Sequence, residues 1–358
     1  MTTADPARRL LALLRRQPVV SGEQLSARLG ISRAAIWKHV EQLRARGYRI
    51  EAQHARGYRL TGVPDRLLPE EIVPRLTARR LGRRIVYFEE TDSTNVQAMR
   101  LARDGAPEGT LVLAERQTHG RGRLGRSWSS PAYVNLYASW ILRPTLAPAA
   151  APQVSLAAAL GVARVLATHA PGRVAIKWPN DCLLDGRKVS GILTEMDAEI
   201  DRVRAVVLGI GVNLNGTERA FPAELRPTAT SVRLATRRRV DRIAFTAALC
   251  DALESVYDRL LQDGFAPLIG EWNEYSCLTG KQVTVDCSGQ RTTGTVRGLD
   301  ASGRLVLALA GASEGADGAA DVQGSERVQY IVAGDVTVVG GYARATAGTE
   351  RATRSEGR

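Results

Sequence analysis

A short run of glycines and arginines, residues 120–126, is the part of the sequence best suited to chemistry. It holds three glycines and three arginines, and it follows residues 110–115, an apolar run typical of a β-strand. Glycine lets the backbone approach a ligand closely, and the planar arginine head offers a fork of donors that matches phosphate and carboxylate. No Asp or Glu occurs between Arg116 and Asn180. The segment therefore predicts a site for an anionic ligand; a solvated basic loop would explain the arginines but not their alternation with glycine.

The same glycines, Gly120, Gly122 and Gly125, match the spacing of a dinucleotide-binding fingerprint. That fingerprint requires a helix directly after the glycines and an acidic residue about 20 positions later. Here residues 129–131 (Ser-Ser-Pro) oppose a helix, an alternating apolar run follows, and the acidic residue is missing. A Rossmann-type site is therefore not expected.

Other polar clusters lie where predicted strands end. Asp185-Gly186 stands between two apolar runs and predicts a tight hairpin, which places Lys188 at the start of the returning strand. Taken singly, each polar residue has an ordinary explanation: Ser93 as a helix N-cap, Lys188 as a hairpin lysine, Asn213 as a strand-end turn. Only the order and spacing of the clusters favour a shared site.

The elements that must position these clusters form a predicted central domain, residues 67–275. Strands are expected at residues 84–88, 110–117, 133–142, 182–184, 189–196 and 203–212. An alanine-rich helix is predicted at residues 152–168, and a second amphipathic helix carries Leu249, Leu253, Val256 and Leu260 on one face.

The N-terminal segment, residues 1–63, has a different character. Residues 1–66 hold 13 Lys and Arg against 5 Asp and Glu, a net charge of +8 out of the +12 of the whole chain. A stripe of leucines at positions 10, 11, 13 and 14 predicts a first helix. A capping box at Ser21 and Gln24 predicts a second, and Ser32 caps a third. Two short strands, residues 48–51 and 58–60, complete a pattern that resembles a winged helix-turn-helix, whose second helix enters the DNA major groove. A helical protein-docking module is the alternative. Residues 63–66 are the expected linker.

The C-terminal segment, residues 278–342, consists of short alternating runs that suggest a small β-barrel. The glycine- and alanine-rich residues 311–324 and the tail, residues 343–358, contain almost no large apolar side chains and are predicted to be disordered.

Composition limits the classes of protein that fit. The chain has 358 residues, 44% of them hydrophobic, enough for two or three domains, and no apolar run of membrane-spanning length is apparent. The N-terminus lacks the apolar core of a signal peptide. The four cysteines are scattered without metal-ligand spacing, which predicts reduced thiols in a cytoplasmic protein and no bound structural metal.

Five motifs, in this order, resemble the biotin protein ligases of the bifunctional type, which combine ligase and biotin operon repressor in one chain. The resemblance spans about residues 7–340. The motifs read Asp92-Ser-Thr-Asn95, Gln117-Thr-His-Gly-Arg-Gly-Arg-Leu-Gly-Arg-Ser-Trp128, Lys177-Trp-Pro-Asn-Asp181, Gly186-Arg-Lys-Val-Ser-Gly-Ile-Leu193 and Gly209-Ile-Gly-Val-Asn213.

The resemblance implies an α+β fold with three parts: a winged helix-turn-helix, a mixed-sheet catalytic domain like that of class II aminoacyl-tRNA synthetases, and an SH3-like C-terminal barrel. It also implies a reaction. Biotin and ATP, with Mg²⁺, give biotinyl-5′-AMP and pyrophosphate, and biotin then passes to a lysine of a biotin carboxyl carrier protein. Carboxylate attack on a phosphate brings two anions together, so catalysis is expected to rest on positioning and charge neutralisation.

The resemblance assigns roles residue by residue. The expected catalytic residues are Lys188, Arg121, Arg123 and Asp181. The expected biotin-binding residues are Ser93, Thr94, Asn95, Gln117, Arg121, Gly122, Arg123, Lys188 and Gly191. The expected adenylate-binding residues are Arg123, Arg126, Trp128, Asn180 and Asn213. The expected DNA-binding residues are Ser32, Arg33, Trp37 and Lys38.

The expected partners are the carrier protein, operator DNA and a second copy of the chain. In this family biotinyl-AMP orders the glycine-rich loop and favours a homodimer that binds a two-half-site operator. Three alternatives stay open: a ligase with a vestigial DNA module, a ligand-sensing transcription factor without transfer activity, and a lipoate ligase, which shares the catalytic fold.

Overall fold

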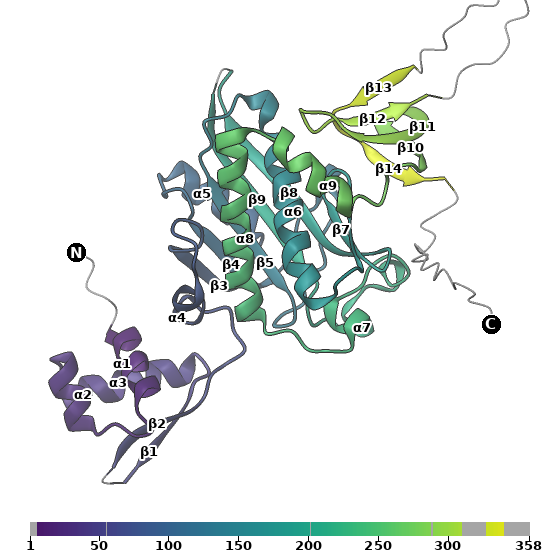
Figure 1. Cartoon of the computed structure of the whole chain (residues 1–358). Coiled ribbons are helices and arrows are strands. Elements are labelled where there is room, and N and C mark those ends of the chain that lie inside the picture. The colour runs from purple at the N-terminus through teal and green to yellow at the C-terminus, as the bar shows by residue number, and fades with distance from the viewer. Residues whose placement is uncertain (1–5, 55, 201, 288, 310–326, 340–358) are drawn as a thin grey trace, which may run out of the picture. The chain divides into compact units, whose positions relative to one another are not determined.

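The computed structural model describes residues 6–54, 56–200, 202–287, 289–309 and 327–339. The chain divides into two compact units, residues 1–71 and 72–358 (Figure 1). The two stretches predicted to be disordered, residues 311–324 and 343–358, lie outside the described residues.

The first unit contains three helices and a hairpin, in the order that the sequence predicts. Helices α1 (Pro6–Arg16), α2 (Gly22–Leu29) and α3 (Arg33–Ala45) precede strands β1 (Arg49–Gln53) and β2 (Gly57–Gly62), which pair antiparallel. The Ser21–Gln24 capping box is present at the start of α2, and Ser32 caps α3. Ile36, Val40 and Leu43 of α3 are buried, as their helical spacing predicts.

This unit continues past the expected linker at residues 63–66. Arg15 and Tyr48 both donate to the buried carboxylate of Glu71, and Arg46 donates to Glu70 at 2.9 Å. Burial and the bond to Glu71 raise the pKa of Tyr48 above its usual range. These contacts hold the chain that follows the hairpin against the helices, which explains why the unit ends at Glu71.

The second unit is built on a mixed sheet of seven strands in the order β3-β4-β5-β9-β8-β7-β6. Only β3 and β4 pair in parallel; the other neighbours are antiparallel. The strands are β3 (Ile85–Thr91), β4 (Leu111–Gln117), β5 (Leu136–Leu142), β6 (Val174–Lys177), β7 (Asp181–Leu184), β8 (Arg187–Ala198) and β9 (Val203–Val212).

Helices cover both faces of this sheet. Helices α6 (Pro152–His169) and α8 (Arg242–Asp263) pack together on one face, as Figure 1 shows. Helix α5 (Thr94–Arg103) packs on β4, β5 and β9 through a small apolar cluster that includes Ala98, Val112, Ile141 and Val207. The remaining helices are α4 (Pro69–Ile72), α7 (Val232–Thr236) and α9 (Ile269–Tyr275).

One expectation about composition needs correction. The segment Pro148–His169 is long and apolar enough to cross a membrane, contrary to the expectation that the chain has no apolar run of that length. Its apolar window is 72% buried inside the protein, and residues such as Leu156, Leu160 and Val162 are fully covered. Its hydropathy is explained by its place as the central helix of the core, where it faces both the sheet and α8.

The predicted hairpin at Asp185-Gly186 is present. Both residues have positive φ, 52° and 76°, as the tight turns that suit a twisted pair of strands require. The turn sets Lys188 of β8 opposite Leu183 of β7.

The C-terminal segment forms a five-stranded antiparallel sheet in the order β13-β12-β11-β10-β14. Its strands are β10 (Gln282–Cys287), β11 (Gln290–Leu299), β12 (Leu305–Ala308), β13 (Val328–Ile331) and β14 (Asp335–Val338). The buried Trp178, next to β6, donates from Nε1 to the Gly303 carbonyl at 3.2 Å. A side chain of a central motif is therefore bonded to the turn before β12.

Candidate functional site

The predicted ligand residues of the second unit gather around two adjoining cavities. The first is narrow, with a volume of about 50 Å³, and the second, about 560 Å³, lies within the range of small-molecule sites. The first is lined by Ser93, Thr94, Asn95, Gln117, Arg121, Gly122, Arg123, Trp128, Asn180, Lys188 and Gly191, among others. The second is lined by Arg126, Asp181 and Asn213, and it shares Arg123, Trp128, Asn180 and Lys188 with the first.

The start of α5 supplies one wall of the first cavity. Ser93 occupies the N-cap position but makes no capping hydrogen bond with its side chain, so the simple capping explanation is wrong. Thr94 donates from its backbone nitrogen to Gln117 Oε1 at 2.8 Å, and its hydroxyl lies 3.1 Å from the same atom. These contacts fix hydroxyls and an amide at the edge of the first cavity.

Glycines in two paired strands form the floor beneath Trp128. Gly191 of β8 lies opposite Gly211 of β9, and a Cβ added to Gly211 would come within 2.5 Å of the Trp128 ring. A Cβ on Gly191 would meet the same ring at 2.9 Å. Real Cβ atoms do not approach other heavy atoms so closely, so both glycines are needed for the indole to lie flat on the sheet.

Cationic groups converge where the two cavities meet. Lys188 Nζ forms an ion pair with Asp181 Oδ1 at 2.7 Å and lies 5.5 Å from the centre of the Trp128 ring. Arg123 donates to Asn180 Oδ1 at 3.0 Å, and burial lowers the pKa of its guanidinium. A partly desolvated cluster of this kind attracts an anion more strongly than exposed lysines and arginines would.

Residues 120–128, here called the glycine-arginine loop, supply Arg121, Gly122, Arg123 and Trp128 to the lining of the first cavity. No helix follows the glycines; a single 3₁₀ turn (Arg123–Gly125) is present instead, in agreement with the rejection of a dinucleotide fold. Arg121 pairs with Glu195 of β8 at 2.9 Å. Arg126 pairs with Asp335 of β14, so the C-terminal sheet contributes a carboxylate to the second cavity.

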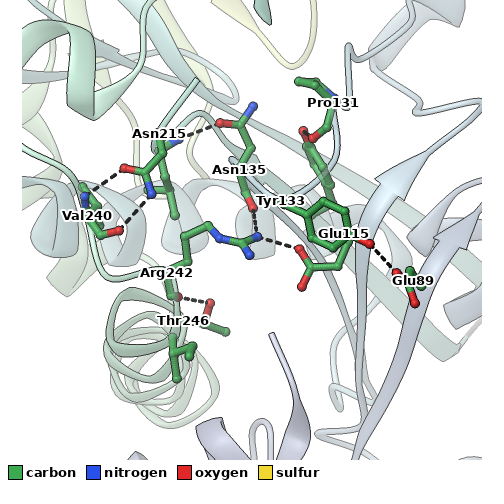
Figure 2. Close-up of polar contacts among 12 residues, drawn as sticks. Glu89, Glu115, Pro131, Tyr133, Asn135, Asn215, Val240, Arg242 and Thr246 are labelled. Atoms are coloured by element: carbon green, nitrogen blue, oxygen red, sulfur yellow. Dashed lines mark hydrogen bonds and ion pairs between the residues drawn. The ribbon is translucent and has the colours of Figure 1, made fainter. Parts of the chain in front are cut away.

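A buried polar network joins Glu115, Asn135 and Arg242 (Figure 2). It extends to Asn213 at the end of β9. Arg242, at the start of α8, pairs with Glu115 of β4 at 2.7 Å, and both side chains are 0% exposed. The same guanidinium donates to the Asn135 carbonyl at 3.1 Å. Asn135 accepts a hydrogen bond from the Leu214 backbone at 3.0 Å, and its amide nitrogen lies 3.4 Å from Asn213 Oδ1. The network therefore links the start of α8 to Asn213, which lines the second cavity.

The four predicted DNA-binding residues lie in the first unit, on α3 or at its start. Arg33, Trp37 and Lys38 are exposed, and Trp37 leaves 59% of its surface in solvent although it is a large aromatic residue. Ser32 uses its side chain to accept a hydrogen bond from the Ala35 backbone, so its hydroxyl is already engaged in capping.

Several residues at the cavities have no role in the sequence-based prediction. Lys177 and Asp335 line the second cavity, and burial lowers the pKa of the Lys177 ammonium. Lys177 belongs to the motif Lys177–Asp181 and to the stretch without acidic residues, and this position in the sequence could have indicated a place at an anion site. Asp335 and Glu195 belong to no motif, and only the fold brings them near the loop.

Comparison with known proteins gives the relationship. The Biotin/lipoate A/B protein ligase family matches residues 87–213, and an HTH domain matches residues 7–59. The chain is 40% identical over 288 residues, 80% of its length, to a Bifunctional ligase/repressor BirA of Bacillus subtilis, of which it covers 89%.

A further relative and a solved structure match a smaller part of the chain. A Biotin--[acetyl-CoA-carboxylase] ligase of Paracoccus denitrificans is 40% identical over 61% of this chain and 91% of its own. The biotin protein ligase of Aquifex aeolicus in complex with biotin and ATP superposes with a TM-score of 0.59 at 26% identity, covering 72% of this chain and 99% of that one. With an HTH domain, the ligase sheet and this identity over most of its length, the chain belongs to the BirA family of bifunctional biotin ligase/repressors.

Proposed function

We propose that the protein activates biotin with ATP to biotinyl-5′-AMP and transfers biotin to a lysine of a biotin carboxyl carrier protein, and that it also represses biotin biosynthesis genes. The observation that carries the ligase half is the pair of adjoining cavities. One is small and edged with hydroxyls and an amide, the other is large, and the cluster of Lys188, Arg123 and Asn180 lies between them.

In the first step a biotin carboxylate oxygen attacks the α-phosphorus of ATP, a bond forms there, and the bond to the pyrophosphate oxygen breaks. We assign the ureido ring to Ser93, Thr94 and Gln117 in the first cavity, because burying that ring without partners would cost roughly 1–3 kcal/mol per polar group. Lys188 lies between the cavities and is assigned to the carboxylate and the α-phosphate oxygens. Arg121, Gly122 and Arg123 cover the activated acid, with Asn95 and Gly191 at its side.

In the second step the amine of the acceptor lysine attacks the biotinyl carbonyl carbon, and AMP leaves with the electron pair of the broken C–O bond. We assign the adenylate to Arg126, Trp128, Asn180 and Asn213, all of which line the larger cavity. Asp181 Oδ1 lies 2.7 Å from Lys188 Nζ. We assign Asp181 either to holding Lys188 in place or to binding the amine of the acceptor lysine.

Mg²⁺ is expected to accompany ATP. Among the described residues no group of three or more His, Cys, Asp or Glu is arranged to hold a metal ion, but Asp181 and Asp335 both line the larger cavity. One or two carboxylates together with substrate phosphates are a usual Mg²⁺ environment. Asp181 and Asp335, which pair with Lys188 and Arg126, are the residues that would hold an ion arriving with the nucleotide. It would supply charge neutralisation at the phosphates.

We infer that the first unit binds operator DNA through α3, with Arg33, Trp37 and Lys38 toward the major groove and Ser32 at the start of the helix. The basic charge of this segment and the exposed Trp37 support the assignment. One such module has a small footprint, so selective binding requires two half-sites and hence a homodimer. We propose that biotinyl-AMP promotes this dimer, and that the protein works in the cytoplasm without a membrane partner.

The finer structural assignments are also proposals. We propose that the C-terminal sheet is an SH3-like barrel and that the central sheet is of the class II aminoacyl-tRNA synthetase type. We further propose functional domains at residues 1–63, 67–275 and 278–342, followed by a disordered tail at residues 343–358.

Two experiments separate this proposal from its alternatives. Purified protein with biotin, ATP and an acceptor domain should biotinylate the acceptor, and lipoate in excess should not compete; transfer of lipoate instead would make the protein a lipoate ligase. In the presence of biotin and ATP the protein should shift its own biosynthetic promoter in a salt-sensitive manner. A salt-insensitive result, or no shift, would leave a ligase with a vestigial DNA module.

A further inference from the structure

The contact between Arg121 and Glu195 has no place in the reaction described above. Arg121 lines the first cavity, but Glu195 does not. Glu195 lies on β8 four residues after Gly191, so its side chain is on the strand face where a side chain at position 191 would lie. Its carboxylate pairs with Arg121 of the glycine-arginine loop and does not line the cavity.

Both carboxylate oxygens of Glu195 have partners. Oε1 pairs with Arg121 at 2.9 Å, and Oε2 accepts a hydrogen bond from Asn95 Nδ2 at 2.8 Å. The Asn95 amide is in turn held on both sides: Nδ2 also donates to the Leu193 carbonyl at 3.2 Å, and Oδ1 accepts from Ser139 at 2.6 Å. Both polar atoms of the Asn95 side chain therefore have protein partners, and one of these partners is Glu195. The resemblance, by contrast, assigns Asn95 to biotin.

Gly209 is part of the same arrangement. A Cβ at Gly209 would collide with the Asn95 side-chain amide, closer than real Cβ atoms ever come to a neighbour. The Glu195 carboxylate therefore accounts for one residue in each of two motifs. Asn95 binds it directly, and Gly209 leaves room for the Asn95 amide.

The other end of the loop is tied into the same set of contacts. The Ser130 hydroxyl donates to the Trp128 carbonyl at 3.0 Å and accepts from Gln117 Nε2 at 2.9 Å. Gln117 is bonded to Thr94, and the Thr94 hydroxyl lies 2.8 Å from that of Ser139. A continuous path of side chains thus runs beneath the glycine-arginine loop, from Trp128 at one end to Arg121 at the other.

We propose that Glu195 is a positioning residue that holds Arg121 down and so keeps the glycine-arginine loop closed over biotinyl-AMP until the acceptor arrives. The inference rests on the ligase function proposed above. Glu195 does not line the cavity, so its loss should change the retention of the intermediate far more than the initial binding of biotin.

The test is the release rate of biotinyl-AMP from full-length protein. The intermediate is formed with biotin and labelled ATP, chased with unlabelled intermediate, and followed over time. Glu195→Gln removes the charge and sets an amide nitrogen against one of two donors, so release should accelerate roughly tenfold, the scale of a charged hydrogen bond discounted for partial exposure, while biotin affinity changes little. Asn95→Asp, which places a second carboxylate against Glu195, should accelerate release in the same way.

Glu90→Gln is the matched control. Glu90 pairs with Arg116 at 2.6 Å on the neighbouring strands β3 and β4, with both side chains about half exposed, and neither residue lines a cavity. Its release rate should equal that of the unmodified protein. A melting temperature measured for each variant separates loss of folding from loss of the Glu195–Arg121 contact. Glu195→Asp is a milder substitution that keeps the charge.

The outcomes are distinct. If the unmodified protein forms no biotinyl-AMP, the proposed function fails. If the unmodified protein forms biotinyl-AMP, and the folded variants Glu195→Gln and Asn95→Asp release it at a rate within twofold of the unmodified protein, Glu195 does not hold the loop closed. A parallel loss of biotin affinity and retention would make Glu195 part of the biotin site instead.

Discussion

Replacement of Lys188 by alanine tests the cationic cluster that joins the two cavities. The Lys188 ammonium lies 2.7 Å from Asp181 and is about one-third exposed, so it can face an anion in a partly desolvated site. Two unit charges 4 Å apart interact by about 4 kcal/mol at an effective dielectric constant of about 20. Each 1.36 kcal/mol is about a factor of ten in rate. Because Arg121 and Arg123 remain, we expect a loss of about 10²–10³ in the rate of biotinyl-AMP formation.

The measurement is single-turnover formation of biotinyl-AMP with ATP and biotin both saturating. Arg187→Ala, at the neighbouring position of β8 and outside both cavities, is the control and should react at the unmodified rate. The double variant Asp181→Asn with Lys188→Ala addresses the other explanation, that a carboxylate left without its partner causes the loss. We expect no recovery in the double variant. A Lys188→Ala rate within a few-fold of the unmodified protein would refute the assignment of Lys188 to the reacting groups.

Three further predictions follow from other parts of the structure. Trp37→Ala combined with Lys38→Glu, on the exposed face of α3, should abolish promoter binding in an electrophoretic shift assay and leave biotinyl-AMP formation unchanged; a loss of both activities would mean that the two units depend on each other. Arg242→Met leaves the fully buried Glu115 carboxylate without its ion-pair partner and should lower the free energy of unfolding by about 3–5 kcal/mol in urea titrations, whereas Arg242→Met with Glu115→Gln should recover part of that loss; equal destabilisation would refute the ion-pair explanation. Gly211→Ala sets a methyl group against the Trp128 ring and should raise the KM for ATP, whereas Gly270→Ala, in open space on α9, should not; an unchanged KM in Gly211→Ala would refute the packing of Trp128 on the glycine floor.

Local patterns in the sequence predict most of the elements of this fold. The capping box at Ser21, the positive-φ turn at Asp185-Gly186 and the spacing of Ile36, Val40 and Leu43 each specify a structure within a few residues of themselves. Such signals do not depend on the rest of the chain, and all three are present. The apolar segment Pro148–His169 shows the limit of a local pattern: its length and hydropathy suit a membrane span as well as a core helix, and only its packing on α8 inside the protein distinguishes the two.

The site is less accessible to sequence reasoning because its contacts join distant residues. Glu195 reaches Arg121 from another strand, Asp335 reaches Arg126 across 209 positions, and Arg242 reaches Glu115 across 127. Arg121 and Arg126 belong to the glycine-arginine loop, but their partners Glu195 and Asp335, and the pair Arg242 and Glu115, stand in no recognisable local pattern. The structure also gives Asn95 contacts that differ from its expected one with biotin, because both of its polar atoms already have protein partners.

Biotin-dependent exchange of pyrophosphate into ATP tests the central claim most directly. The purified full-length chain, with Mg²⁺ and labelled pyrophosphate but without acceptor, should catalyse exchange only when biotin is present, and lipoate should not replace biotin. Exchange that is absent with biotin, or that proceeds equally with lipoate, would contradict the account.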